Sequence, residues 1–85
     1  MDEASPLYPT EAEALAATGE IYRHFKGGIY RLVMRGVKDS DTLEDGVIYE
    51  QLWPHEHRFW YRHESSFFGV RDGGEARFVL IKYKE

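Results

Sequence analysis

The fold is decided by one stretch of sequence, Tyr22-Arg23-His24-Phe25-Lys26-Gly27-Gly28-Ile29-Tyr30-Arg31-Leu32-Val33-Met34. Bulky strand-forming residues lie on both sides of Gly27-Gly28 and alternate with polar ones, which is the period of a β-strand. Glycine tolerates the positive φ angles that a tight reversal needs, so the pair predicts a turn between two strands. The resulting hairpin carries basic and histidine side chains beside its turn, where a ligand can reach them.

Length and composition indicate one small domain with a hydrophobic core. The chain has 85 residues, of which 42% are hydrophobic and 15% aromatic, and disordered chains lack this much apolar material. The sequence contains no cysteine. A disulfide framework, a thiolate zinc site and a cysteine nucleophile are therefore excluded.

The charges are unevenly distributed along the chain. Lys and Arg total 11 against 15 for Asp and Glu, and the formal net charge of -4 opposes nonspecific attraction to phosphate backbones. Acidic residues gather in the N-terminal tail and between Asp39 and Asp45. The first hairpin instead concentrates basic and histidine residues, namely Arg23, His24, Lys26, Arg31 and Arg35. This asymmetry indicates an anionic partner.

We expect a cytoplasmic protein with no membrane partner. Residues 1–6 lack a basic region followed by an apolar core, and no later run is long and apolar enough to span a bilayer. The absence of cysteine suits a reducing cytosol.

A short helix is predicted before the first strand. Thr10 is placed as an N-cap with Glu13 three residues later, as in a capping box, and Gly19 follows as a helix stop. The apolar face of residues 11–18 is thin, so we expect this helix to pack loosely beside the main domain. The chain thus divides into a tail and short helix over residues 1–18 and a β domain over residues 19–85.

The rest of the chain predicts further strands separated by turns. Residues 47–53, 58–62 and 76–83 are rich in β-branched and aromatic residues, and Pro54 ends the first of these strands. Residues 38–46 form a polar loop, while residues 65–69 and 72–74 are typical of turns. With no convincing internal helix, the sequence favours an all-β fold, a small barrel of about five strands.

Several motifs resemble the bacterial DUF1653 family in order and spacing across Gly19 to Ile81, namely Gly19-Glu20-Ile21-Tyr22-Arg23-His24-Phe25-Lys26-Gly27, Ser40-Asp41-Thr42-Leu43-Glu44, Val47-Ile48-Tyr49, Trp60-Tyr61-Arg62 and Phe67. The resemblance implies a compact SH3-like barrel and no established activity. The sequence departs from the family pattern at Asp39, where a histidine is usual, at His63, where a proline is usual, and at Gly69, where an acidic residue is common.

A ligand site is predicted on the surface formed by the first hairpin, the Ser/Thr loop and the Trp-x-Arg strand. Its residues supply donors, cations and aromatic faces, and they are Tyr22, His24, Lys26, Ser40, Thr42, Trp60 and Arg62. These types suit a small anionic ligand, a nucleotide or a peptide; single-stranded nucleic acid is a special case. The alternative is structural: core tyrosine and tryptophan, turn-capping hydroxyls and an arginine paired across strands.

Neither a cofactor nor a catalytic centre is predicted. His55, His57 and His63 lack a standard metal-ligand spacing, and the acidic loop lacks the ligand pattern of a calcium-binding loop. Ser40, His24 and Asp41 are residue types found in hydrolases, but no recognised catalytic motif contains them. We therefore expect a binding module rather than an enzyme, with catalysis as a lesser possibility.

A structural or protein-interaction unit is the rival function. Val79, Ile81 and Tyr83 lie on the predicted C-terminal strand, and an exposed strand edge can join a second subunit or another protein. The sequence leaves the oligomeric state open.

Overall fold

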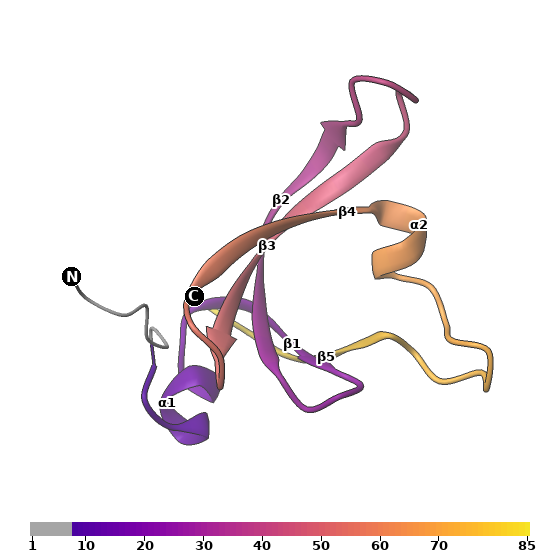
Figure 1. The fold of residues 1–85 in the computed structure, drawn as a ribbon. Helices are drawn as coiled ribbons and strands as arrows, with labels where there is room; N and C mark the ends of the chain where they lie inside the picture. Colours follow the sequence, from indigo (N-terminus) through magenta and orange to yellow (C-terminus); the bar gives the residue numbers. More distant parts are fainter. Residues whose placement is uncertain (1–7) are drawn as a thin grey trace.

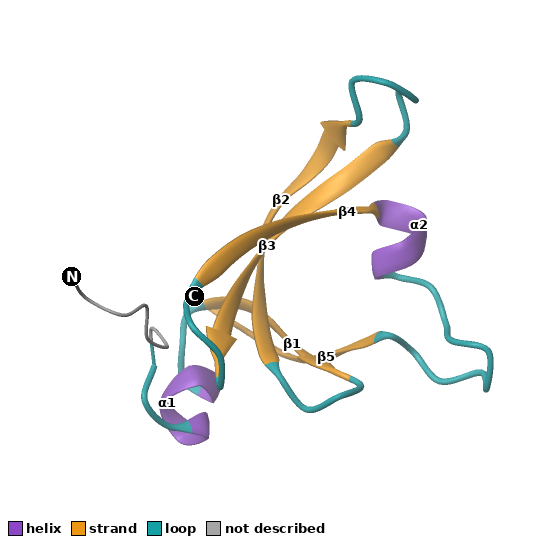
Figure 2. Ribbon diagram, viewed as in Figure 1, coloured by secondary structure: helices purple, strands orange, loops and turns teal. Residues whose placement is uncertain are grey.

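A computed structural model describes residues 8–85. One antiparallel sheet dominates it (Figures 1 and 2). Along the chain, one short helix precedes the first strand and a second lies between the fourth and fifth strands. The elements are α1 (Glu11–Leu15), β1 (Gly19–His24), β2 (Ile29–Lys38), β3 (Asp45–Trp53), β4 (Arg58–His63), α2 (Glu64–Phe67) and β5 (Phe78–Lys84). No helix in residues 8–85 is long and apolar enough to cross a membrane.

The predicted first hairpin is confirmed. β1 pairs antiparallel with β2, with Tyr22 opposite Tyr30. The turn is closed by the His24 N–H, which donates to the Gly28 carbonyl over 2.8 Å, and by the Gly27 N–H, which donates to the His24 carbonyl over 2.7 Å. Gly27 has a φ of 102°, a conformation that favours glycine, so the sequence explains this turn directly.

The five antiparallel strands are confirmed, but the sheet is not closed into a barrel. The strand order is β4-β3-β2-β1-β5, so β4 and β5 are the outer strands, and no strand pairing joins them within residues 8–85. The sheet is bent by register shifts in β2, including one between Met34 and Val37, and by another in β1. Instead of pairing with β5, β4 leads into α2, whose Phe67 side chain packs on Tyr49 of β3 and on Phe78 of β5.

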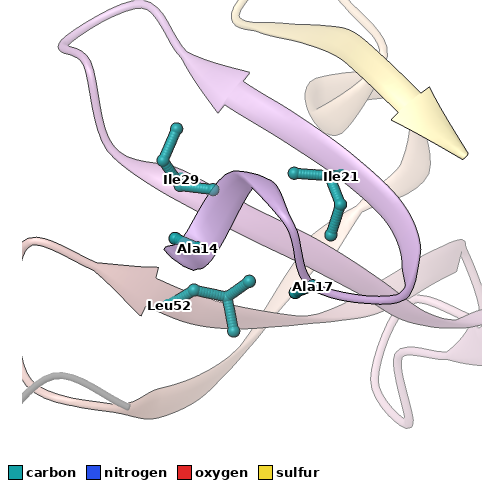
Figure 3. Close-up of a cluster of buried hydrophobic side chains, with 5 residues drawn as sticks. All are labelled: Ala14, Ala17, Ile21, Ile29 and Leu52. Carbon is teal, nitrogen blue, oxygen red and sulfur yellow. The ribbon is translucent and has the colours of Figure 1, made fainter. Parts of the chain in front are cut away.

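The first core cluster corrects the prediction that α1 packs loosely. Ala14 and Ala17 are buried against Ile21, Ile29 and Leu52 (Figure 3). The capping box at Thr10 forms, but the helix is shorter than predicted and ends at Leu15. The buried side chains are Ala14 and Ala17, which are small enough to allow close approach to the sheet, while Ala12 and Ala16 are exposed.

The second core cluster is aromatic and lies on the other side of the bent sheet. It comprises Tyr22, Val47, Tyr49, Phe67 and Phe78. Phe67 is fully buried and belongs to α2, a single helical turn in a segment predicted as a loop turn. The candidate site lies directly against this cluster.

Candidate functional site

A hollow of about 220 Å³ lies beside the second core cluster. We call it the aromatic groove, and it is lined by His24, Tyr30, Tyr49, Gln51, Trp60, Arg62 and Phe78. The lining residues come from all five strands, so strand pairing and register fix their relative positions. A hollow with aromatic walls and few polar groups is the usual form of a ligand site.

The groove wall is held in place by ring packing. Tyr30 lies 5.5 Å from Tyr49 and 5.5 Å from Phe78 between ring centroids, and Tyr49 lies 5.3 Å from Phe78. Phe67 stacks on Phe78 at 4.2 Å with an interplanar angle of 12°. Burial and these ring contacts together restrict the rotamers of the wall, so the groove is preformed.

Gln51 orients the exposed indole at the mouth of the groove. Its side-chain oxygen accepts hydrogen bonds from Trp60 Nε1–H over 3.0 Å and from the Tyr30 hydroxyl over 3.5 Å, while its Nε2–H donates to the Glu56 carbonyl over 2.7 Å. The indole is 44% exposed despite this anchor. Trp60 therefore offers a fixed aromatic surface to solvent.

Arg62 supplies a positive charge at the groove. Its Nε–H donates to the Tyr49 hydroxyl over 3.3 Å, and its Nη1–H donates to Ser66 Oγ over 3.0 Å. Both partners are neutral, and no carboxylate of residues 8–85 forms an ion pair with Arg62. Its guanidinium charge is therefore uncompensated by the fold, which leaves it available to an anion.

A larger hollow of about 530 Å³ adjoins the aromatic groove and shares His24 and Tyr30 with it. We call it the hairpin pocket, because the β1–β2 turn forms one side, with α1 and the segment after β3 opposite. Arg23 in this pocket pairs with Glu11 over 2.6 Å. Lys26 lies on its rim with its ammonium 5.7 Å from the Phe25 ring centroid.

His24 stands between the two hollows in a positive environment. Burial, followed by the nearby charges of Arg62 and Lys26 and then of Arg77 and Arg71, lowers the pKa of the imidazole below its usual 6.5. Its Nδ1 accepts a hydrogen bond from the Lys26 N–H over 3.2 Å. The ring is neutral at pH 7, and an anion bound nearby would favour its protonation.

The structure brings together some of the predicted site residues and separates others. His24, Trp60 and Arg62 line the aromatic groove, and Lys26 lines the adjoining hairpin pocket. Tyr22 lines neither hollow: it is buried beneath the groove and its hydroxyl donates to Glu20 over 3.0 Å. Ligand binding by His24, Lys26, Trp60 and Arg62 stays a prediction.

Ser40 and Thr42 lie outside both hollows. They belong to the β2–β3 loop, at the far end of the long β2–β3 hairpin from the β1–β2 turn (Figure 1). Thr42 Oγ1 accepts the Glu44 N–H over 3.2 Å, and the Asp39 carboxylate accepts the Thr42 N–H over 3.3 Å. Thr42 therefore follows the turn-capping alternative, and neither Ser40 nor Thr42 lines the groove.

Two departures from the family pattern pair with each other. His63 Nε2 lies 2.9 Å from an oxygen of Asp39, and Nδ1 lies 3.3 Å from a carboxylate oxygen of Glu44. Hydrogen bonding to Asp39 raises the pKa of His63 above its usual 6.5 and lowers the pKa of Asp39. The pair ties the β2–β3 loop to the end of β4.

The histidines do not gather into a metal centre. His57 bonds to Glu50 over 2.6 Å, His63 bonds to the β2–β3 loop, and His55 lines the hairpin pocket. Across the described range 8–85, no group of three or more His, Asp or Glu side chains is arranged to hold a metal ion.

Sequence reasoning missed Tyr30, Tyr49, Gln51 and Phe78 as groove residues. The two tyrosines look like ordinary period-two core positions, and only the pairing of Tyr22 with Tyr30 and of Tyr49 with Trp60 puts them on one face. Phe78 enters the groove because β5 pairs with β1 and places Phe78 opposite His24. A correct strand order would have identified all four.

The fold and its groove define a small, mostly β protein with a preformed aromatic and cationic hollow. Residues 20–80 match the family described as a protein of unknown function (DUF1653). The match covers most of the chain, which therefore belongs to the DUF1653 family. No curated protein matches the sequence, and no solved structure matches the fold.

Proposed function

We propose that this chain is a non-catalytic binding module that recognises a small anionic ligand, either a nucleotide or an acidic peptide. The ligand binds in the aromatic groove, with its anionic group beside Arg62 and a planar or apolar group against Trp60. His24 and Lys26 extend the positive surface into the hairpin pocket.

One observation carries the proposal: the Arg62 charge, which no carboxylate in the described chain neutralises, lies in a hollow with an exposed indole. Folded proteins normally pair or solvate such charges, and an arginine held by two neutral hydroxyl oxygens is already oriented for an anion. The ligand would then form the charged hydrogen bonds that the fold leaves open.

We propose that the protein is not an enzyme, because the groups that a hydrolase would need lie apart from one another. Ser40 and Asp41 belong to the β2–β3 loop, and His24 ends β1 beside the opposite turn. Ser66, which does approach the groove, accepts a hydrogen bond from Arg62 on its Oγ, and a guanidinium cannot act as a general base.

The test is an amide NMR titration of the labelled protein with AMP and, separately, with tetraglutamate. We expect shifts at His24, Arg62 and the Trp60 indole N–H with one of the two probes. Arg62→Ala should weaken that binding by roughly 10- to 150-fold, because hydrogen bonds to charged groups contribute about 1.5–3 kcal/mol. Lys26→Ala should weaken it with little change in melting temperature, since Lys26 is exposed.

Lys82→Ala is the matched control, because Lys82 is a cation on β5 that lines neither hollow. Binding that is unchanged in Arg62→Ala, or shifts confined to other surfaces, would contradict the proposal. No shifts with either probe would favour the rival function.

That rival is a protein-interaction unit built on the free edge of β5. Val79, Leu80, Ile81 and Tyr83 are 51%, 53%, 41% and 63% exposed, and β5 pairs only with β1 in the described part of the chain. Exposed apolar edge strands tend to recruit another strand. Light scattering at high protein concentration tests the homodimer version: a dimer that Ile81→Lys dissociates would support it, and a monomer would remove it.

A further inference from the structure

The positive surface continues beyond the aromatic groove. A third hollow of about 250 Å³ is lined by Val70, Arg71, Asp72, Gly73 and Arg77, in the segment between α2 and β5. Figure 1 shows this segment on the same side of the molecule as α2 and the β1–β2 turn. We call the third hollow the loop pocket.

Ser66 links the loop pocket to the aromatic groove. Arg62 of the groove donates to Ser66 Oγ over 3.0 Å, and Arg77 of the loop pocket donates from Nε to the Ser66 carbonyl over 3.2 Å. On the other side, the hairpin pocket shares His24 with the groove. The hairpin pocket and the groove thus share a wall, and the two bonds to Ser66 place Arg77 of the loop pocket close to the groove; we call the three hollows together the path.

A cation stands at each stage of this path. Lys26 lies in the hairpin pocket, Arg62 in the groove and Arg77 in the loop pocket. None of these three pairs with a carboxylate of residues 8–85. Two carboxylates also line the path, Glu11, which pairs with Arg23, and Asp72, so its lining keeps a positive balance on a protein whose net charge is -4.

One exposed aromatic face lies beside these cations. Trp60 is 44% exposed at the groove. Phe25 is instead covered by cations, with the Lys26 ammonium 5.7 Å and the Arg71 guanidinium 3.7 Å from its ring centroid. A series of cations beside an exposed indole matches a polymer that carries both phosphates and planar bases.

We infer that the natural ligand of this path is a short single-stranded nucleic acid. Its phosphates lie at Lys26, Arg62 and Arg77, and one base stacks on Trp60. The inference rests on the proposed function and names its ligand class. A single strand fits because its bases are free to stack, whereas those of a duplex are already stacked on one another.

The acidic residues restrict binding to this path. Asp39, Asp41 and Asp45 lie in or beside the β2–β3 loop, at the far end of its hairpin from the β1–β2 turn (Figure 1). They disfavour phosphates there, so the β2–β3 loop does not extend the path. The inferred ligand is therefore a strand of a few nucleotides that contacts Lys26, Arg62 and Arg77.

The experiment measures fluorescence anisotropy of fluorescein-labelled oligothymidylate and oligouridylate of about eight nucleotides, within the site sizes of small single-strand-binding folds. The full chain is titrated at several salt concentrations. Three phosphate contacts predict a slope of about -2 in log K against log salt, since each contact on a single strand contributes roughly -0.7. Comparing the two probes shows whether the 2′-hydroxyl matters.

Single variants then locate the contacts. Lys26→Ala and Arg77→Ala should each make the slope less steep by roughly 0.7, and Lys82→Ala should leave it unchanged. Trp60→Leu should weaken binding by roughly 5- to 150-fold at every salt concentration, because it removes one stacked base. Lys26 is exposed, so its variant tests the path even if Trp60→Leu misfolds.

The outcomes separate this inference from the proposed function. If neither oligonucleotide binds but AMP or tetraglutamate still binds at Arg62, the inference of a nucleic-acid ligand is wrong, and the proposed anion site in the groove stands. Salt-independent oligonucleotide binding also overturns it. Failure of every anionic probe overturns both proposals.

Discussion

Replacing Phe67 with alanine should remove much of the stability of this domain. The side chain is fully buried, stacks on Phe78 at 4.2 Å, and lies 5.2 Å from both Tyr22 and Tyr49 between ring centroids. Truncating such a phenylalanine costs about 3–5 kcal/mol, of which the lost aromatic pairs account for a part. Small domains have only about 5–15 kcal/mol in total, so Phe67→Ala should unfold far more easily than the parent.

Chemical denaturation followed by circular dichroism measures this loss, and the next residue provides the control. Phe68 is 43% exposed; its ring centroid lies 4.9 Å from that of Phe67, and the Arg35 guanidinium lies 4.8 Å from it. Phe68→Ala should therefore cost about 1 kcal/mol. Equal losses in the two variants would refute the claim that α2 completes the core and supports the groove.

Two further predictions concern the β2–β3 loop and the strand beside it. The Asp39 partner raises the pKa of His63 in the folded state. The His63–Asp39 pair therefore stabilises the fold fully below pH 6.5, and this stabilisation is lost as the pH rises through the raised pKa of His63 in the folded state. His63→Gln should remove this decline of the denaturation midpoint with rising pH. A decline that persists in the variant would mean that another group causes it. Gly46→Ala should destabilise the fold by about 1 kcal/mol, because its Cβ would overlap the Tyr61 ring, which would have to swing outward and give up its hydrogen bond to the Val37 carbonyl. Gly73 faces open space, so Gly73→Ala should be nearly neutral in the same melting assay, and equal effects would contradict the overlap.

The local parts of the fold were predictable because neighbouring residues determine them. The capping box at Thr10 and the turn at Gly27 each follow from the conformational preference of a few adjacent residues. α2 is the exception. Its four residues carry no helical period, and it forms because Phe67 has a buried place to occupy.

The open sheet and the full groove were not predictable, because both depend on contacts between distant segments. Phe78 meets His24 only through the pairing of β5 with β1, and Arg77 meets Arg62 only through Ser66. The candidate list found His24, Trp60 and Arg62 from their chemistry alone. It also included Ser40, which lies in the loop at the tip of the long β2–β3 hairpin, away from the groove.

The most direct test of the account is the pKa of His24 with and without a bound anion. The ring resonances are followed by NMR from pH 5 to pH 8 in the free protein and with 3′,5′-cyclic AMP, whose phosphodiester stays ionised throughout. We predict a pKa below 6.5 in the free protein and a higher value when the anion is bound, with tighter binding at lower pH. Arg62→Ala should raise the pKa of the free protein, because it removes a nearby positive charge. A His24 pKa that stays unchanged both at millimolar cyclic AMP and at millimolar tetraglutamate would contradict the claim that the groove beside Arg62 holds an anion.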